Sequence, residues 1–107
     1  MATVTITGDS GTKYAFDVFG LDSNINAVAG VYAVTDRHES AQGGYSHTVI
    51  YFGQTSDLDG RFSDHDKADC FKDHGANSLC FHADENEQSR LVKESDLIEA
   101  YNPPCND

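Results

Sequence analysis

A cation and an imidazole lie on the apolar stripe of a helix predicted for the segment TSDLDGRFSDH, residues 55–65. At 100° per residue from Leu58, Phe62 falls at about 40°, Arg61 at about 300° and His65 at about 340°. A helix that only packs against a core would carry aliphatic side chains at the last two positions. Since a guanidinium matches the geometry of a phosphate, Arg61 is a candidate for binding a phosphate ester.

A carboxylate is displaced in the same way in the last predicted helix, which contains the segment EQSRLVKESDLIEAY. With Leu91 at 0°, Glu94 falls at about 300°, in the middle of the apolar arc, whereas Asp96 and Glu99 at about 140° and 80° are expected to be solvated. A buried carboxylate is costly unless it is protonated, paired or bound to a cation. Two readings stay open: a structural ion pair with Arg61, or a divalent metal on Glu94 beside a phosphate on Arg61.

The segments that would position these groups have the sequence patterns of strands and helices. Residues 3–18 predict a hairpin around the turn GDSG, and the segments GVYAVT, HTVIYFG and NSLCFHA predict three further strands. Tyr32 and Tyr51 are then expected on neighbouring antiparallel strands. The polar segment DRHESAQGGYS between them is expected to be a mobile connection. A second helix is expected to stop at Gly75, and the last to start near Asp84.

Composition limits the function classes. The 107 residues suit one domain, and 18 acidic against 7 basic residues give a formal charge of −11. This charge repels polyanions at long range. A nucleic-acid function must therefore rest on a local positive spot, a metal ion, a basic partner or a high-salt environment.

The three cysteines predict reduced thiols more than a disulfide framework, because Cys70, Cys80 and Cys105 are odd in number and lack CxxC spacing. A zinc site from these cysteines with His65, His74 and His82 is the weaker alternative, since the spacings match no standard finger. The sequence has neither an 18-residue apolar run nor a signal-peptide pattern. A soluble, cytoplasmic protein without membrane contact is expected.

Five features in order make the sequence resemble the GIY-YIG nucleases. The two name-giving tripeptides correspond to GVY, residues 30–32, and YFG, residues 51–53. The segment QTSDLDGRF follows with Leu and Arg at the family spacing, and ESDLIEAYNPPCN resembles the closing pattern of Glu, Leu-Ile and Pro-x-x-Asn. The resemblance covers roughly residues 27–106.

The resemblance implies an α/β (α+β) fold, a small, mostly antiparallel three-stranded sheet flanked by helices. Residues 1–26 would form an added N-terminal β-hairpin and residues 27–107 the catalytic domain, in one compact unit. The implied activity is metal-dependent endonuclease cleavage of nucleic acid, with DNA as the expected partner. A homodimer would suit double-strand cleavage.

The resemblance also implies site roles residue by residue. Tyr32 would be the general base or would position water, and Tyr51 would hydrogen-bond in the same site. A phenol near pKa 10 is a poor base at neutral pH, so Tyr32 would need the metal and Arg61 nearby to favour its phenolate. Arg61 would stabilise charge on the scissile phosphate.

The remaining roles involve the metal and the end of the chain. Glu94 would ligate one Mg²⁺ or Mn²⁺, which keeps several waters and so accepts one protein carboxylate as its anchor. His65 matches the Arg-x-x-x-His spacing of some restriction-enzyme members, where the histidine lies beside the reacting phosphate. Asn106 would hold the C-terminal end against the site.

One position departs from the family. Repair-type members often carry Lys after the second Gly, whereas this chain has Gln54, and it lacks the basic helices and tails that grip DNA. The alternative function is therefore a catalytically degenerate GIY-YIG-like binding module that contacts a protein partner, for which the acidic surface would suit a basic protein. A zinc-stabilised structural domain is a third, weaker alternative.

Overall fold

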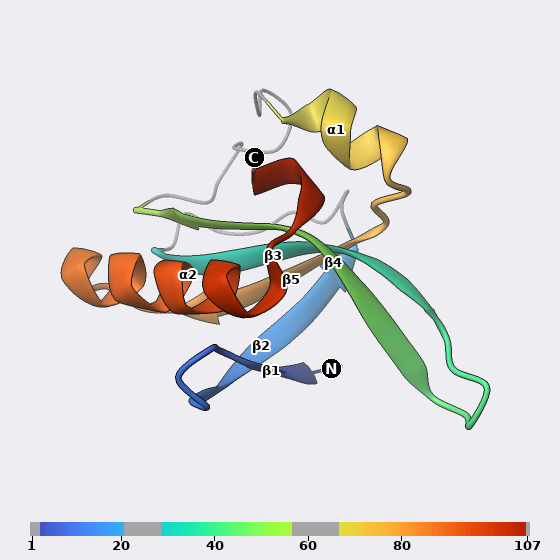
Figure 1. The fold of residues 1–107 in the computed structure, drawn as a ribbon, viewed down its shortest axis with the longest axis horizontal. Coiled ribbons are helices and arrows are strands. Elements are labelled where there is room, and N and C mark those ends of the chain that lie inside the picture. Colours follow the sequence, from blue (N-terminus) through green and yellow to red (C-terminus); the bar gives the residue numbers. More distant parts are fainter. Residues whose placement is uncertain (1–2, 21–28, 57–66, 107) are drawn as a thin grey trace.

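The protein is an α+β fold built mostly from strands, seen here in a computed structural model that describes residues 3–20, 29–56 and 67–106. Five antiparallel strands form one curled sheet in the order β1-β2-β5-β3-β4 (Figure 1). The strands are β1 Thr3–Thr7, β2 Lys13–Gly20, β3 Gly30–Glu39, β4 Tyr45–Thr55 and β5 Ser78–Ala83. The helices are α1 Ala68–Asp73, α2 Glu87–Tyr101 and the short 3-10 helix η1 Pro104–Asn106.

The sheet has five strands, so the expectation of a three-stranded sheet was wrong in strand number. The three expected strands form the β5-β3-β4 part, and the N-terminal hairpin continues the same sheet because β2 pairs with β5. The cause is the apolar face of the hairpin. Ile6, Tyr14 and Phe16 alternate with exposed residues and are buried in one cluster with residues of β3 and β4.

The turn of this hairpin is tied to α2 by one carboxylate. Asp96 accepts hydrogen bonds from the backbone N–H and the hydroxyl of Ser10 and from the hydroxyl of Tyr14, each at 2.8 Å. These bonds lower the pKa of Asp96. Asp96 stays partly exposed, as expected, but its bonds to the turn were not predicted, because the helical projection does not contain the neighbouring turn.

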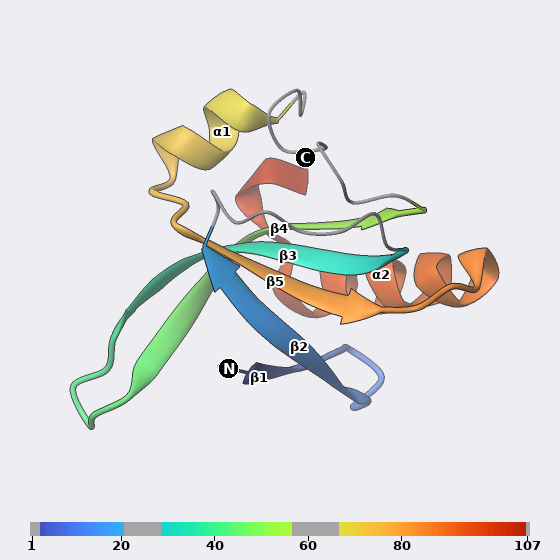
Figure 2. The ribbon, with the colours of Figure 1, turned by 180° about the vertical axis from the view of Figure 1, so that it is seen from behind.

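Two apolar clusters cover the two faces of the sheet, because successive strand residues point to opposite sides. Val31 and Ala33 of β3 pack in the cluster that contains Leu97 of α2. Tyr32 and Val34 pack in the cluster that contains Phe71 of α1 and Cys105 of η1. The two longer helices therefore cover opposite faces (Figure 2).

The polar segment between β3 and β4 was expected to be a connection, but residues 36–39 and 45–46 belong to the paired strands and only residues 40–44 connect them. Pairing continues from Thr35↔Val49 to Glu39↔Tyr45 beyond a register shift at Val34/Thr35, and the hairpin projects from the body as a bent arm (Figure 1). The Arg37 guanidinium lies 4.0 Å from the ring centroid of Tyr45 on the partner strand. Backbone pairing and this cation–π contact support the arm without an apolar pattern.

The helix ends agree partly with the expectations. Helix α1 ends at Asp73, and Gly75 has the positive φ of 76° that terminates it. Helix α2 is capped by Asn86, whose side chain accepts from the N–H of Ser89 at 2.8 Å. The start expected near Asp84 was two to three residues early. No helix in the described part of the chain is both long and apolar enough to cross a membrane.

Candidate active site at the edge strand

Tyr32 and Tyr51 lie side by side on one face of the sheet. Tyr32 is opposite Gly53 and Tyr51 is opposite Val34 in the β3–β4 ladder, which makes the two tyrosines diagonal neighbours. Their ring centroids are 6.0 Å apart with an interplanar angle of 37°. Tyr32 is 4% exposed and Tyr51 is partly buried. The prediction that these tyrosines lie on neighbouring antiparallel strands is confirmed.

Gly53 is required by the approach of the Tyr32 ring. A Cβ atom on Gly53 would lie 2.5 Å from the hydroxyl oxygen of Tyr32, a distance that real Cβ contacts do not show. Gly30 at the start of GVY is equally confined, since a Cβ atom there would lie 2.5 Å from Phe81 Cζ. Gly53 is therefore explained by the Tyr32 ring, and Gly30 by the backbone carbonyl of His82, which an added Cβ would approach even more closely, together with the Phe81 ring.

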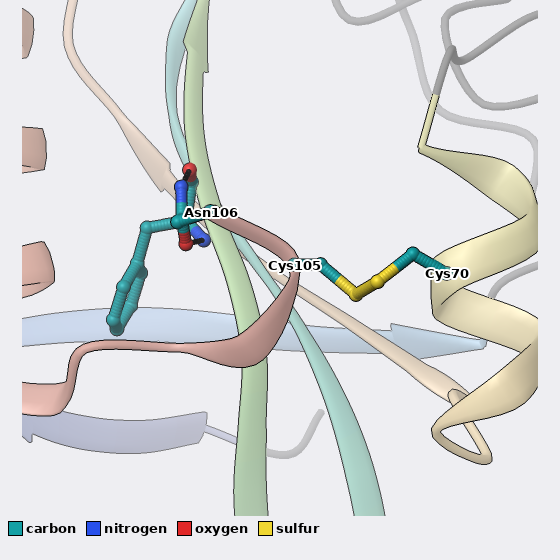
Figure 3. Close-up of a disulfide and its surroundings, with 4 residues drawn as sticks. Cys70, Cys105 and Asn106 are labelled. Carbon is teal, nitrogen blue, oxygen red and sulfur yellow. Dashed lines mark hydrogen bonds between the residues drawn. A yellow bond between two sulfur atoms is a disulfide. The ribbon is translucent and has the colours of Figure 1, made fainter.

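The outer edge of β4 binds the C-terminal end of the chain. β4 is the last strand of the sheet, so one row of its backbone groups faces away from β3. Phe52 donates its N–H to Asn106 Oδ1 at 2.9 Å, and Asn106 Nδ2 donates to the carbonyl of Phe52 at 2.8 Å. Figure 3 shows Asn106 at this strand, next to the disulfide that holds η1.

The next outward amide of β4 is taken by Glu94. The backbone N–H of Gln54 donates to the Glu94 carboxylate, which lowers the pKa of that group, but desolvation is the larger effect and the pKa is raised. Glu94 is half-buried on α2. In the described part of the chain, no Lys, Arg or His forms an ion pair with it. One acceptor position is thus in use, and the carboxylate retains capacity for a cation.

Gln54 connects two residues of α2. Its side-chain Oε1 accepts from Arg90 Nε at 2.9 Å, while its backbone binds Glu94. Arg90 is 4% exposed and also donates to the carbonyl of Asp84 at 3.2 Å. Sequence reasoning missed Arg90. The helical projection places it at about 260°, on the same arc as Glu94, and would have found it.

Tyr32 and Glu94 therefore contact consecutive residues of the edge strand. Tyr32 contacts Gly53 from the face covered by α1, and Glu94 binds Gln54 from the side of α2. Asn106 hydrogen-bonds Phe52 of the same strand, two residues before Gln54. Arg61 and His65, with the helix expected around them, lie outside the described residues.

Two of the three cysteines form a disulfide, so the expectation of three reduced thiols was wrong. Cys70 of α1 is bonded to Cys105 of η1 across a sequence separation of 35, and only Cys80 is free. Pairing depends on which segments the fold brings together, which cysteine spacing does not reveal. Burial raises the pKa of Cys80 to about 11, as expected for an inert core thiol.

The zinc set considered from the sequence does not assemble as a whole. Cys80 lies in β5 with its sulfur 3.9 Å from Nδ1 of His47. His82 has its ring nitrogens 2.9 Å from the carbonyl of Ala15 and 2.9 Å from Lys93 Nζ. His74 alone of the expected histidines in the described ranges lies with Cys70, and the third member of that group is Cys105.

Replacement of Glu94 by Gln is expected to raise stability at neutral pH. Because the folded state raises the pKa of Glu94, ionised Glu94 opposes folding, whereas Gln keeps an oxygen for the Gln54 N–H and carries no charge. Wild type gains stability relative to E94Q as pH falls from about 7 to about 4. The measurement is urea unfolding at several pH values.

Glu99→Gln is the matched control, since Glu99 is exposed on the same helix. At neutral pH we expect E94Q to gain more stability than E99Q. This difference between the two variants should disappear at acid pH. An E94Q protein that is less stable than wild type at pH 7 would show that Glu94 contributes a stabilising ion pair.

No family model, curated protein or solved structure matches this chain. The functional assignment therefore depends on the geometry of the edge strand and on the residue pattern.

Proposed function

We propose that this protein is a metal-dependent endonuclease that hydrolyses phosphodiester bonds in nucleic acid, and that the GIY-YIG resemblance reflects this activity. One observation carries the proposal. A tyrosine pair on β3 and β4 and a half-buried carboxylate without a described cationic partner contact neighbouring residues of one edge strand. Structural stability alone does not require a carboxylate there, since an amide would accept the same hydrogen bond.

The Glu94 carboxylate fits a Mg²⁺ or Mn²⁺ ion. Oxygen is the ligand these ions prefer, and Mg²⁺ uses one or two carboxylates with waters. Ionised Glu94 is unfavourable in its desolvated position, and a cation would remove that cost. When bound, the ion would polarise a phosphoryl oxygen and lower the pKa of coordinated water.

The protein groups would orient the substrate and move a proton. Tyr32 belongs to β3 and its ring packs against Gly53 of β4. Its hydroxyl would position or deprotonate the attacking water. Arg61 would bind the scissile phosphate, where a guanidinium stabilises the charge that develops on the oxygens. Tyr51 would hydrogen-bond on the same face of the sheet as Tyr32. His65 would lie beside the phosphate.

The test is cleavage of supercoiled plasmid with Mg²⁺ or Mn²⁺ across low to moderate salt. Wild type is expected to nick the plasmid, and Arg61→Ala and Glu94→Gln are each expected to slow nicking by about a hundredfold. Glu99→Gln, exposed on α2, is the control and should nick at the wild-type rate. RNA is assayed in parallel.

Absence of cleavage on DNA and RNA under all these conditions would contradict the proposal. It would favour the degenerate binding module, for which the formal charge of −11 suits a basic protein partner. Equal nicking by E94Q and wild type would exclude Glu94 as the metal ligand.

A further inference from the structure

Cys70, His74 and Cys105 bring three metal-binding atoms together at the junction of α1 and η1. Their two sulfurs and one imidazole nitrogen all lie within 4.8 Å of one another. The cluster lies apart from Glu94, which belongs to α2 on the other face of the sheet. The nuclease proposal does not use it.

The backbone holds two of these groups at a fixed spacing. Cys70 and His74 are four residues apart, and the N–H of His74 donates to the carbonyl of Cys70 at 3.1 Å. Side chains at this spacing lie over the same face of a helical turn. Cys105 reaches them from η1, where it is 1% exposed and packed in the core cluster of that face.

These atoms match zinc chemistry once the sulfurs are reduced. Zinc binds thiolates at about 2.3 Å and imidazole at about 2.0 Å in a tetrahedron, so its ligand atoms lie roughly 3.3–3.8 Å apart. The three ligand atoms lie within 4.8 Å of one another, so opening of the disulfide and small side-chain rotations would bring them to that spacing. The disulfide itself is no zinc ligand, because zinc binds thiolates.

We propose that the Cys70–His74–Cys105 cluster is a zinc site in the reduced protein, so that a disulfide and a zinc ion are alternative crosslinks between α1 and η1. A dithiol reductant transfers two electrons and two protons to the disulfide and becomes a disulfide itself. Zn²⁺ then displaces two protons from the thiols and takes the His74 imidazole as its third protein ligand. Three protein ligands leave a fourth position for water.

Either crosslink would keep Asn106 on the edge strand. Asn106 follows Cys105 directly and hydrogen-bonds both backbone groups of Phe52 (Figure 3). In the reduced, metal-free protein, η1 loses its covalent connection to α1. Zinc restores that connection under reducing conditions, in which a disulfide does not persist.

The test measures zinc binding by the full chain in both redox states. Protein reduced with a phosphine and freed of excess reductant is titrated with Zn²⁺ against a chromophoric chelator, beside untreated oxidised protein. The reduced form is expected to bind one equivalent and the oxidised form none. Co²⁺ should give the absorbance of a thiolate-ligated tetrahedral site only in the reduced form.

His74→Ala is the decisive variant, because His74 is exposed and is not part of the disulfide. It is expected to weaken zinc binding by at least about tenfold, as loss of one ligand does. His38→Ala, an exposed histidine on the β3–β4 arm, is the control and should bind as wild type does. Reduced protein that binds no zinc, or His74→Ala that binds as tightly as wild type, would overturn the proposal.

Discussion

Gly53→Ala is expected to destabilise the protein by about 3–4 kcal/mol, which is at the upper end for adding a single methyl group to a packed site. The added Cβ would lie 2.5 Å from the Tyr32 hydroxyl oxygen. The Tyr32 ring has little room to move, because it is 4% exposed and packs in the cluster with Val34, Phe71 and Phe81. The measurement is the free energy of unfolding in urea.

A double-mutant cycle with Tyr32→Leu separates this steric conflict from a general intolerance of alanine at position 53. Without the ring, the added methyl has space, so Gly53→Ala should cost much less in the Tyr32→Leu background. Thr48→Ala, exposed on the same strand, is the control for loss of strand stability. Strictly additive effects of the two substitutions would contradict the close approach of Tyr32 to Gly53.

Local pattern predicted the strands of the site well, and the pairing of distant segments poorly. Period-two alternation in GVYAVT and HTVIYFG predicts two strands that bury one face, and the tyrosines follow from it. The pairing of β2 with β5 joins residues about sixty positions apart, such as Val18 and Cys80. Such a contact leaves no local signal, so the five-stranded sheet was not predictable from alternation alone.

The arm between β3 and β4 shows a second limit of pattern reading. A prediction based on hydrophobic pattern assigns a loop to a segment with polar residues and two glycines. In the structure, Arg37 and Tyr45 stabilise paired strands there through a cation–π contact. The glycines at 43 and 44 do form the turn, with φ of 91° and 71°. Composition therefore located the turn, and missed the length of the strands that lead to it.

The site was predictable as a set of residue types, and its hydrogen bonds were not. Glu94 on an apolar arc signalled an unusual carboxylate, which agrees with its half-buried position and raised pKa. That its partner is the backbone N–H of Gln54 depends on β4 being the edge strand, a property of the whole sheet. Gln54 was interpreted only as the absence of a lysine, because its contacts also depend on the position of β4 in the sheet. Its side chain accepts from Arg90 and its backbone N–H binds Glu94.

Asn106→Asp is expected to destabilise the protein by about 3 kcal/mol, although the side chain keeps its size. Asn106 both accepts from the Phe52 N–H and donates to the Phe52 carbonyl. An aspartate keeps the acceptor and loses the donor, and it places a negative charge against that carbonyl. Phe52 is 0% exposed, so its carbonyl would lose its partner in a largely desolvated position.

Gln88→Glu is the matched control, because it makes the same change from amide to acid at an exposed position of α2. It should shift the urea midpoint little, whereas Asn106→Asp should lower it strongly and recover part of the loss as the aspartate is protonated in acid. Asn106→Ala separates charge from hydrogen bonding: without the repulsion, we expect it to cost less than the aspartate at pH 7. If all three variants unfold alike, the C-terminal end is not held to β4 through the Asn106 side chain, and the edge strand on which the site is built would need another stabilising contact.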